Sequence, residues 1–183
     1  MKPFLRRGPA CRALSTLFLA AVITLAQSAP VLLNTNLQIR LVMNTTNGGP
    51  NSVRVAKDPR NNQLYYLKIN GDIFRVNLQP GSGSTSTKVY SAADHGLNNS
   101  VEGLAIGPDG HIYLADTESH SIRVIDPRTG TLTLLAGTSE RGDGPEGAPL
   151  RCKMSRPHGI FVDHDGTIFI GDSEAHRVRV LRD

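Results

Sequence analysis

The sequence predicts an all-β protein made of repeated antiparallel sheets, and three observations carry this prediction. Short apolar runs recur along the chain, and Gly, Asp and Pro bound them before they reach helical length. The 18 Gly and 11 Pro residues fall between these runs, which is typical of a chain with many turns. One stretch also occurs twice without a gap, with Gly103 aligned to Gly159, and such self-similarity indicates a repeat architecture.

The first 29 residues are read apart from the fold, because they have the plan of a secretory signal. A basic start precedes the apolar stretch at residues 13–26, and small residues follow it. The stretch is shorter than the roughly 20 residues of a membrane-spanning helix. We therefore expect cleavage near Ser28 or Ala29, with Ala26 as the alternative position, a secreted or periplasmic protein, and no membrane association after signal removal. A retained membrane anchor is the alternative.

Removal of this segment leaves a chain without net charge. The segment holds four of the 20 Lys and Arg residues and no acid, so 16 basic residues face 16 acidic ones. No basic field remains to attract nucleic acid, and we expect no nucleic-acid partner. Because Cys11 leaves with the signal, Cys152 has no partner for an internal disulfide, and we expect a quiet, partly buried thiol.

Each copy of the repeat begins with two strands joined by a tight turn. The continuous apolar runs LAIG (104–107) and IFVD (160–163) suit strands covered on both faces. The Asp-Gly pairs at 109–110 and 165–166 place Gly where a hairpin needs a positive φ. A second apolar run follows each turn.

The third run of each copy alternates apolar residues with Arg, which predicts one buried and one wet face. Arg123 and Arg179 are accordingly expected to lie in solvent. The run TLTLLAG (131–137) supplies a fourth strand in the first of the two copies. A weaker third copy lies upstream and aligns Phe74-Arg75-Val76 with residues 122–124, so Arg75 is also expected to face outward.

Four antiparallel strands that pass from fully buried to half-exposed describe one blade of a β-propeller. We expect blades at about 51–97, 101–138 and 157–183, within a partial propeller that spans residues 30–183. Closed propellers have about 4–8 blades, so a chain of about three blades is incomplete. The missing blades come from remaining sequence or from another chain.

The segments RPHGIFVDHDGTIFIGDSEAHRVRVL and EGLAIGPDGHIYLADTESHSIRVI resemble NHL repeats, which form six-bladed β-propellers of the gluconolactonase-like and TolB-like kind. The first blade is faintly similar to the opening blade of secreted sugar-dehydrogenase propellers. Ser119 and Ala175 stand where the family usually has Asn. The resemblance implies a ring that binds something at one mouth of its channel. It does not imply one function, because related propellers serve as interaction platforms, metal-dependent lactonases, amidating lyases or quinone-dependent sugar dehydrogenases.

Glu102 and His158 are the candidate ligand-binding residues, because each precedes the Gly that opens an innermost strand, near the expected channel mouth. A carboxylate and an imidazole there could bind Ca²⁺ or Zn²⁺, or act as acid and base. The resemblance implies metal binding at these positions, because a Glu-Gly pair at a first strand supplies a metal ligand in gluconolactonase-like propellers. A Pro-His pair before an inner strand supplies a zinc ligand in amidating-lyase-like ones. The alternative is that both are ordinary repeat residues without chemistry.

Four other polar positions are expected to be structural. Asp116 and Asp172 end the second strand of their blades, and their carboxylates are expected to accept hydrogen bonds from backbone N–H groups of the following turn. His120 and His176 follow in these turns and are expected to pack there.

Two functions of different classes stay open, and so does the question whether the protein is an enzyme. The favoured hypothesis is an exported module that binds a protein or a small carbohydrate-like ligand; if loops hold a protein partner, alanine at Glu102 and His158 leaves its binding mostly intact. The alternative is a sugar-directed enzyme, either lactonase-like with a divalent metal or dehydrogenase-like with a quinone. The motifs GxSxG, HExxH and CxxCH are absent from the sequence.

Overall fold

The structure is a computed structural model that describes residues 52–79, 84–97 and 101–182. The chain divides into two units, Met1–Ile39 and Arg40–Asp183, and every described residue belongs to the second. The expected signal segment therefore lies outside the described residues. No helix found in the described ranges is long and apolar enough to cross a bilayer.

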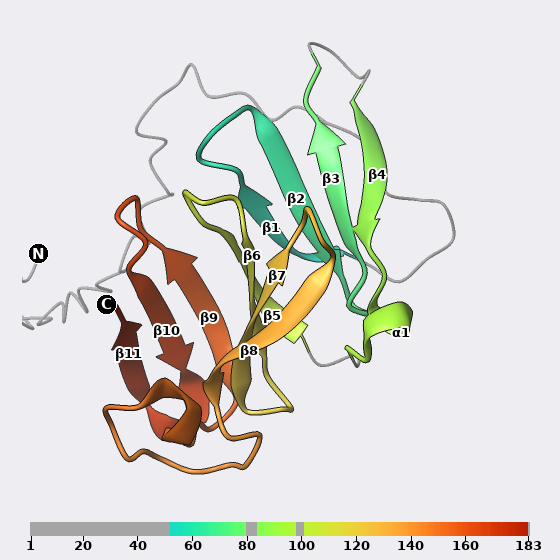
Figure 1. Cartoon of the computed structure of the whole chain (residues 1–183). Coiled ribbons are helices and arrows are strands. Elements are labelled where there is room, and N and C mark those ends of the chain that lie inside the picture. Colours follow the sequence, from blue (N-terminus) through green and yellow to red (C-terminus); the bar gives the residue numbers. More distant parts are fainter. Residues whose placement is uncertain (1–51, 80–83, 98–100, 183) are drawn as a thin grey trace, which may run out of the picture. The chain divides into compact units, whose positions relative to one another are not determined.

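Three antiparallel sheets follow one another along the chain (Figure 1), which confirms the all-β prediction. Blade 1 consists of β1 (Ser52–Lys57), β2 (Gln63–Lys68), β3 (Ile73–Asn77) and β4 (Thr85–Tyr90), and the short helix α1 (Ala92–His95) follows it. Blade 2 consists of β5 (Val101–Ile106), β6 (Ile112–Asp116), β7 (Ser121–Asp126) and β8 (Thr131–Gly137). Blade 3 consists of β9 (Pro157–Val162), β10 (Ile168–Asp172) and β11 (Arg177–Leu181). Single 3₁₀ turns occur at Pro149–Arg151 and Ser173–Ala175.

The blades are arranged as in a propeller. Within each sheet the strands pair in chain order, so the first strand lies at one edge. These first strands contact one another between blades, β1 with β5 and β5 with β9, which makes them the innermost strands around a common axis. The sheets do not close into a ring among the described residues, so the propeller is incomplete there, as expected.

Each blade has two faces, which we call the forward face, toward the blade that follows in the chain, and the rear face. The forward face of blade 1 packs on the rear face of blade 2 in one apolar cluster, whose members include Leu67, Ile73, Leu104, Ile112 and Leu114. The forward face of blade 2 packs on the rear face of blade 3 in a second cluster, whose members include Ala115, Ile122, Met154, Ile168 and Ile170. Full burial of one such aliphatic side chain stabilises the fold by about 1.5–3 kcal/mol. Blade 2 is thus covered on both faces, as its continuous apolar runs predict.

The repeat turns adopt the left-handed backbone that their sequence predicts. Gly110 and Gly166 have φ values of 86° and 88° in the Asp-Gly hairpins. His120 and His176 also have positive φ, 48° and 54°, at matching places in the next turn of each blade. The two copies therefore repeat in backbone geometry as well as in sequence.

The predicted alignment of the third strand in blade 1 is wrong by one residue. Leu67 pairs with Ile73, and Ala115 pairs with Ile122, so Ile73 is the structural match of Ile122. The β2–β3 turn is one residue shorter than the β6–β7 turn, and the sequence alignment lacks this second gap. Arg75 consequently lies on the forward face, opposite Tyr65, and is half-buried instead of exposed.

Candidate functional site

The innermost strands share a β-bulge at the same place in each repeat. In β5 the pairing skips Glu102 between Val101 and Gly103, and in β9 it skips His158 between Pro157 and Gly159. An extra residue of this kind leaves the ladder and re-aims its side chain. The two candidate residues are therefore the bulge residues of neighbouring blades.

The bulges bring the two side chains together. The His158 Nε2 atom lies 3.4 Å from the Glu102 Oε2 atom, although the residues are 56 positions apart in the chain. A third group reaches the same oxygen from blade 1, where the Arg54 Nη2 atom lies 3.8 Å away. The side chains of Arg54, Glu102 and His158 are 44%, 39% and 31% exposed, so a ligand in solvent can reach all three.

The ring of His158 is oriented by the backbone. Its Nδ1 atom lies 2.8 Å from the carbonyl oxygen of Arg156. Because a carbonyl oxygen only accepts, Nδ1 carries the proton and donates, and Nε2 is left to face Glu102. Arg156 has a positive φ of 53°, and its N–H donates to the Nδ1 atom of His120 over 3.2 Å. A turn of blade 2 therefore positions the backbone that orients His158.

This arrangement offers a carboxylate acceptor, a guanidinium donor and an imidazole ring within one small patch. The residues do not fit the Ca²⁺ or Zn²⁺ site that the resemblance implies. Zinc takes three or four protein ligands and calcium six to eight oxygens, whereas Glu102 and His158 supply two ligands. Within the described ranges, no group of three or more His, Cys, Asp or Glu side chains is arranged so that it could hold a metal ion. The Arg54 guanidinium beside Glu102 also repels a cation.

Asp116 and Asp172 are buried, and each accepts a hydrogen bond from an arginine of the third strand of its blade. The Nε atoms of Arg123 and Arg179 donate to Asp116 and Asp172 over 2.7 and 2.8 Å. The backbone N–H of Ser155, which precedes β9, donates to Asp172 over 2.7 Å, so the backbone donor does not come from the following turn.

The exposed setting predicted for these arginines is wrong as well. The side chains of Arg123 and Arg179 are 26% and 10% exposed. The reason is the register: in each blade the Asp and the Arg lie diagonally on the same rear face, which the preceding blade covers. The alternation therefore places Arg in an ion pair between blades.

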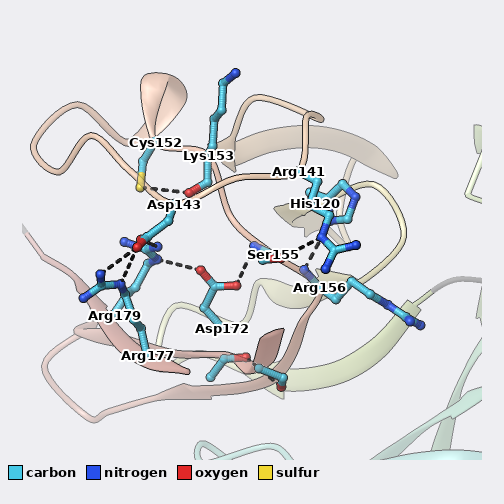
Figure 2. A network of polar contacts seen from close by, with 12 residues as sticks. His120, Arg141, Asp143, Cys152, Lys153, Ser155, Arg156, Asp172, Arg177 and Arg179 are labelled. Atoms are coloured by element: carbon cyan, nitrogen blue, oxygen red, sulfur yellow. Dashed lines mark hydrogen bonds and ion pairs between the residues drawn. The ribbon is translucent and has the colours of Figure 1, made fainter. Parts of the chain in front are cut away.

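Figure 2 shows how the Asp172 pair extends into the loop before blade 3. Asp143 accepts from Arg177 over 2.6 and 2.9 Å and from Arg179 over 2.6 Å. These arginines, Arg177 first, hold the pKa of Asp143 below its ordinary value. Cys152 in the same loop is half-buried, as expected, with its Sγ atom 3.6 Å from the carbonyl oxygen of Lys153.

Arg54 and Arg156 were not predicted from the sequence. Arg54 lies in the blade whose repeat copy is weakest, and no motif marks it. Arg156 could have been found from the repeat alignment. It directly precedes Pro157-His158, and in the other copy Ser100 stands at the same place before Val101-Glu102, so the position is next to a candidate residue in both copies. Its side chain forms ion pairs with Glu118 and Glu174 across the turns of blades 2 and 3.

Comparison with protein families identifies NHL repeats at residues 98–125 and 154–181, which confirms the predicted resemblance. Protein SUPPRESSOR OF QUENCHING 1, chloroplastic, of Arabidopsis thaliana is 32% identical over 79 residues, which are 43% of this chain and 7% of that protein. NHL repeat-containing protein 2 of Homo sapiens is 28% identical over 71 residues, 38% of this chain and 10% of that protein.

Among solved structures, a protein of unknown function from Bacteroides thetaiotaomicron superposes with a TM-score of 0.58 at 23% identity, over 70% of this chain and 32% of that one. A likeness at this identity supports the fold alone. The chain spans a tenth or less of these curated relatives and about a third of the solved protein.

Proposed function

We propose that this segment of an NHL-repeat β-propeller is an exported binding module that holds a small carbohydrate-like ligand at the inner ends of its blades. The observation that carries the proposal is the 3.4 Å contact between the bulge residues Glu102 and His158, which come from different blades. Residues that converge from separate repeats at a channel mouth form a site that no single blade contains.

The chemistry of the three side chains suits a hydroxyl-rich ligand. The Glu102 carboxylate accepts hydrogen bonds from hydroxyl groups, and the Arg54 guanidinium donates to hydroxyl or carboxylate oxygens. The Nε2 atom of His158 accepts when the ring is neutral and donates when it is protonated. A sugar or sugar acid presents both kinds of partner on one face, so it can engage all three residues.

A titration followed by NMR tests this binding. We expect D-gluconate or D-galacturonate to produce saturable shifts in the backbone amide signals of Gly103 and Gly159, which follow the two bulge residues directly. Glu102→Gln and His158→Ala should each weaken binding at least about tenfold, the loss of one good hydrogen bond to a charged group.

Two matched variants serve as controls. Glu140→Gln and His164→Ala alter side chains that are 68% and 89% exposed and lie away from the bulges, so binding should be unchanged. The absence of saturable shifts with either sugar acid would contradict the proposal, and so would equal affinities for Glu102→Gln and Glu140→Gln. In both cases binding of a protein through the loops becomes the better hypothesis.

The enzymatic alternative has its own test. Calorimetry with Ca²⁺, Zn²⁺ and pyrroloquinoline quinone should give flat traces for a binding module. Heat of Ca²⁺ or Zn²⁺ binding that disappears in Glu102→Gln would instead support the lactonase-like enzyme. Saturable binding of the quinone would support the dehydrogenase-like one.

Export is part of the proposal and rests on the tripartite pattern of residues 1–29. Expression of the whole chain in an exporting bacterial host should yield a product that begins just after Ser28 or Ala29. Mass spectrometry of the purified protein measures this. A chain that keeps Met1 and stays in the cytosol would contradict export and leave the binding test unaffected.

A further inference from the structure

A cavity of about 610 Å³ lies between the outer part of blade 2 and the outer part of blade 3. Ala136 lines it from the forward face of blade 2, and Ile170 and Leu181 line it from the rear face of blade 3. The loop between these blades contributes Cys152 and Met154. Cavities that hold small ligands have volumes of about 300–1,000 Å³, so this one is large enough to hold a ligand.

The corresponding place between blades 1 and 2 is filled by a tyrosine. Ile73 of β3 pairs with Tyr90, and its structural match, Ile122 of β7, pairs with Ala136. In both sheets a bulge follows directly after this pair. Tyr90 is therefore the counterpart of Ala136, and a methyl group stands in blade 2 where blade 1 has a phenol side chain.

The surroundings of Tyr90 recur around the cavity. Tyr90 is 3% exposed and belongs to the first apolar cluster, together with Leu114 and Ile125. Burial raises the pKa of Tyr90 to about 12, and the positive charge of Arg123 acts in the opposite direction, so Arg123 lies nearby. The repeat matches Leu114, Ile125 and Arg123 with three residues that line the cavity: Ile170, Leu181 and Arg179.

The hydroxyl group of Tyr90 shows that this place accepts a neutral phenol. It is buried, and in the described part of the chain it has no hydrogen-bond partner. At the cavity, Arg177 and Arg179 already pair with the carboxylates of Asp143 and Asp172, and Figure 2 shows these contacts. Glu146 adds a third carboxylate to the lining. The cavity therefore has no excess positive charge and favours a neutral ligand over an anion.

We propose that the cavity between blades 2 and 3 binds a neutral aromatic small molecule with a phenolic hydroxyl group, which takes the place that Tyr90 takes between blades 1 and 2. Aliphatic side chains around an empty space bind an aromatic ring because the ring restores the packing contacts that the space lacks. In blade 2 the strand β8 pairs with β7 while Tyr90 is in place. Pairing of a further strand with β11 would therefore leave this site available.

A titration with p-cresol, which is the tyrosine side chain as a free molecule, tests the site by NMR. We expect saturable ring-current shifts of the methyl signals of Met154 and Ile170, with a dissociation constant of about 1 mM or lower for a ligand of this size. Benzoate, an anionic ring, should bind at least about tenfold more weakly, because the carboxylates at the cavity repel it.

Two tyrosine variants locate the binding. Ala136→Tyr places a phenol side chain in the cavity, as Tyr90 does one blade earlier, and should weaken p-cresol binding at least about tenfold. Ala93→Tyr is the matched control, because Ala93 is an exposed residue of α1 and does not line the cavity, so binding should be unchanged.

A second measurement on the wild type decides the matter if Ala136→Tyr fails to fold. Cys152 lines the cavity, so a bound ring should shield its thiol from iodoacetamide. Mass spectrometry of the peptide that contains Cys152 measures the rate of alkylation. At ten times the dissociation constant of p-cresol only about one cavity in ten is empty, and we expect alkylation to slow at least about threefold.

Several results would overturn the proposal. Methyl shifts that do not saturate, or an unchanged rate of Cys152 alkylation, would show that no ring enters the cavity. Equal p-cresol affinity of Ala136→Tyr and Ala93→Tyr would place the binding elsewhere, and equal affinity for benzoate and p-cresol would contradict a site for a neutral ligand. These experiments do not involve Glu102 or His158, so this site and the proposed carbohydrate site can fail separately.

Discussion

Asp172 supports the loop and the third strand of blade 3 through one buried carboxylate, so its removal should be costly. The side chain is fully buried and accepts from the Ser155 N–H over 2.7 Å and from Arg179 over 2.8 Å. Asp172→Ala leaves both donors without this acceptor, and Ser155 is itself buried. Figure 2 shows both contacts of the Asp172 carboxylate, to Ser155 and to Arg179.

The expected magnitude follows from these contacts. Breaking a buried ion pair by removing one partner costs about 3–5 kcal/mol. Arg179 keeps Asp143 at 2.6 Å, so we expect the low end, a loss of about 3 kcal/mol in the free energy of unfolding. Asp172→Asn keeps an acceptor for the Ser155 N–H but loses the charge, and we expect a loss of about 1–2 kcal/mol.

Urea unfolding followed by circular dichroism, at one fixed protein concentration, measures these losses. Asp163→Asn is the control, because Asp163 lies in the turn between β9 and β10, where its partly exposed carboxylate contacts the exposed His164, and its midpoint should hardly move. If Asp172→Ala destabilises no more than Asp163→Asn, the buried pair does not hold blade 3 in place and the reasoning is refuted.

Two further predictions concern packing and acid. A Cβ atom added at Gly103 would lie 2.6 Å from the Cβ of Ala115, so Gly103→Ala should lower the free energy of unfolding by about 1–3 kcal/mol. Gly159→Ala is the control, because the nearest atom there is 3.7 Å away, and it should change the free energy of unfolding little in the same urea assay. Hydrogen bonds from Arg60 hold the pKa of Asp58 below its ordinary 3.8, so this carboxylate stabilises the fold above that pH and stops doing so as the pH falls through its lowered pKa. Acid unfolding of Asp58→Asn should therefore show a weaker dependence on pH below 3.8 than that of the wild type, and an unchanged slope would contradict the assignment.

The arrangement of strands within the blades was predictable because it depends on residue patterns that extend over only a few positions. Apolar runs, Asp-Gly turns and alternation each act over a few residues, so they indicate strands without knowledge of the rest of the chain. The error at Arg75 shows the limit of this approach. A single missing residue in the β2–β3 turn reverses the face of every later side chain in the strand, and no local pattern marks the gap.

The candidate site was predictable in part. Its residues Glu102 and His158 could be found because the repeat aligns them, while Arg54 could not, because it belongs to the weakest copy. The environment of Arg179 was equally hidden. Alternation along β11 indicates that one face is wet, but the blade packed behind that face decides whether an Arg there meets water or Asp172.

The sequence by itself determined that this chain forms repeated antiparallel blades, because each strand and turn depends on neighbours close in the chain. The tertiary structure alone decided which side chains of different blades meet, that Glu102 and His158 lie 3.4 Å apart, and which apolar faces stay open. The physical reason is that these contacts depend on strand register and on the packing of one sheet against the next, and both join residues that are far apart in the sequence.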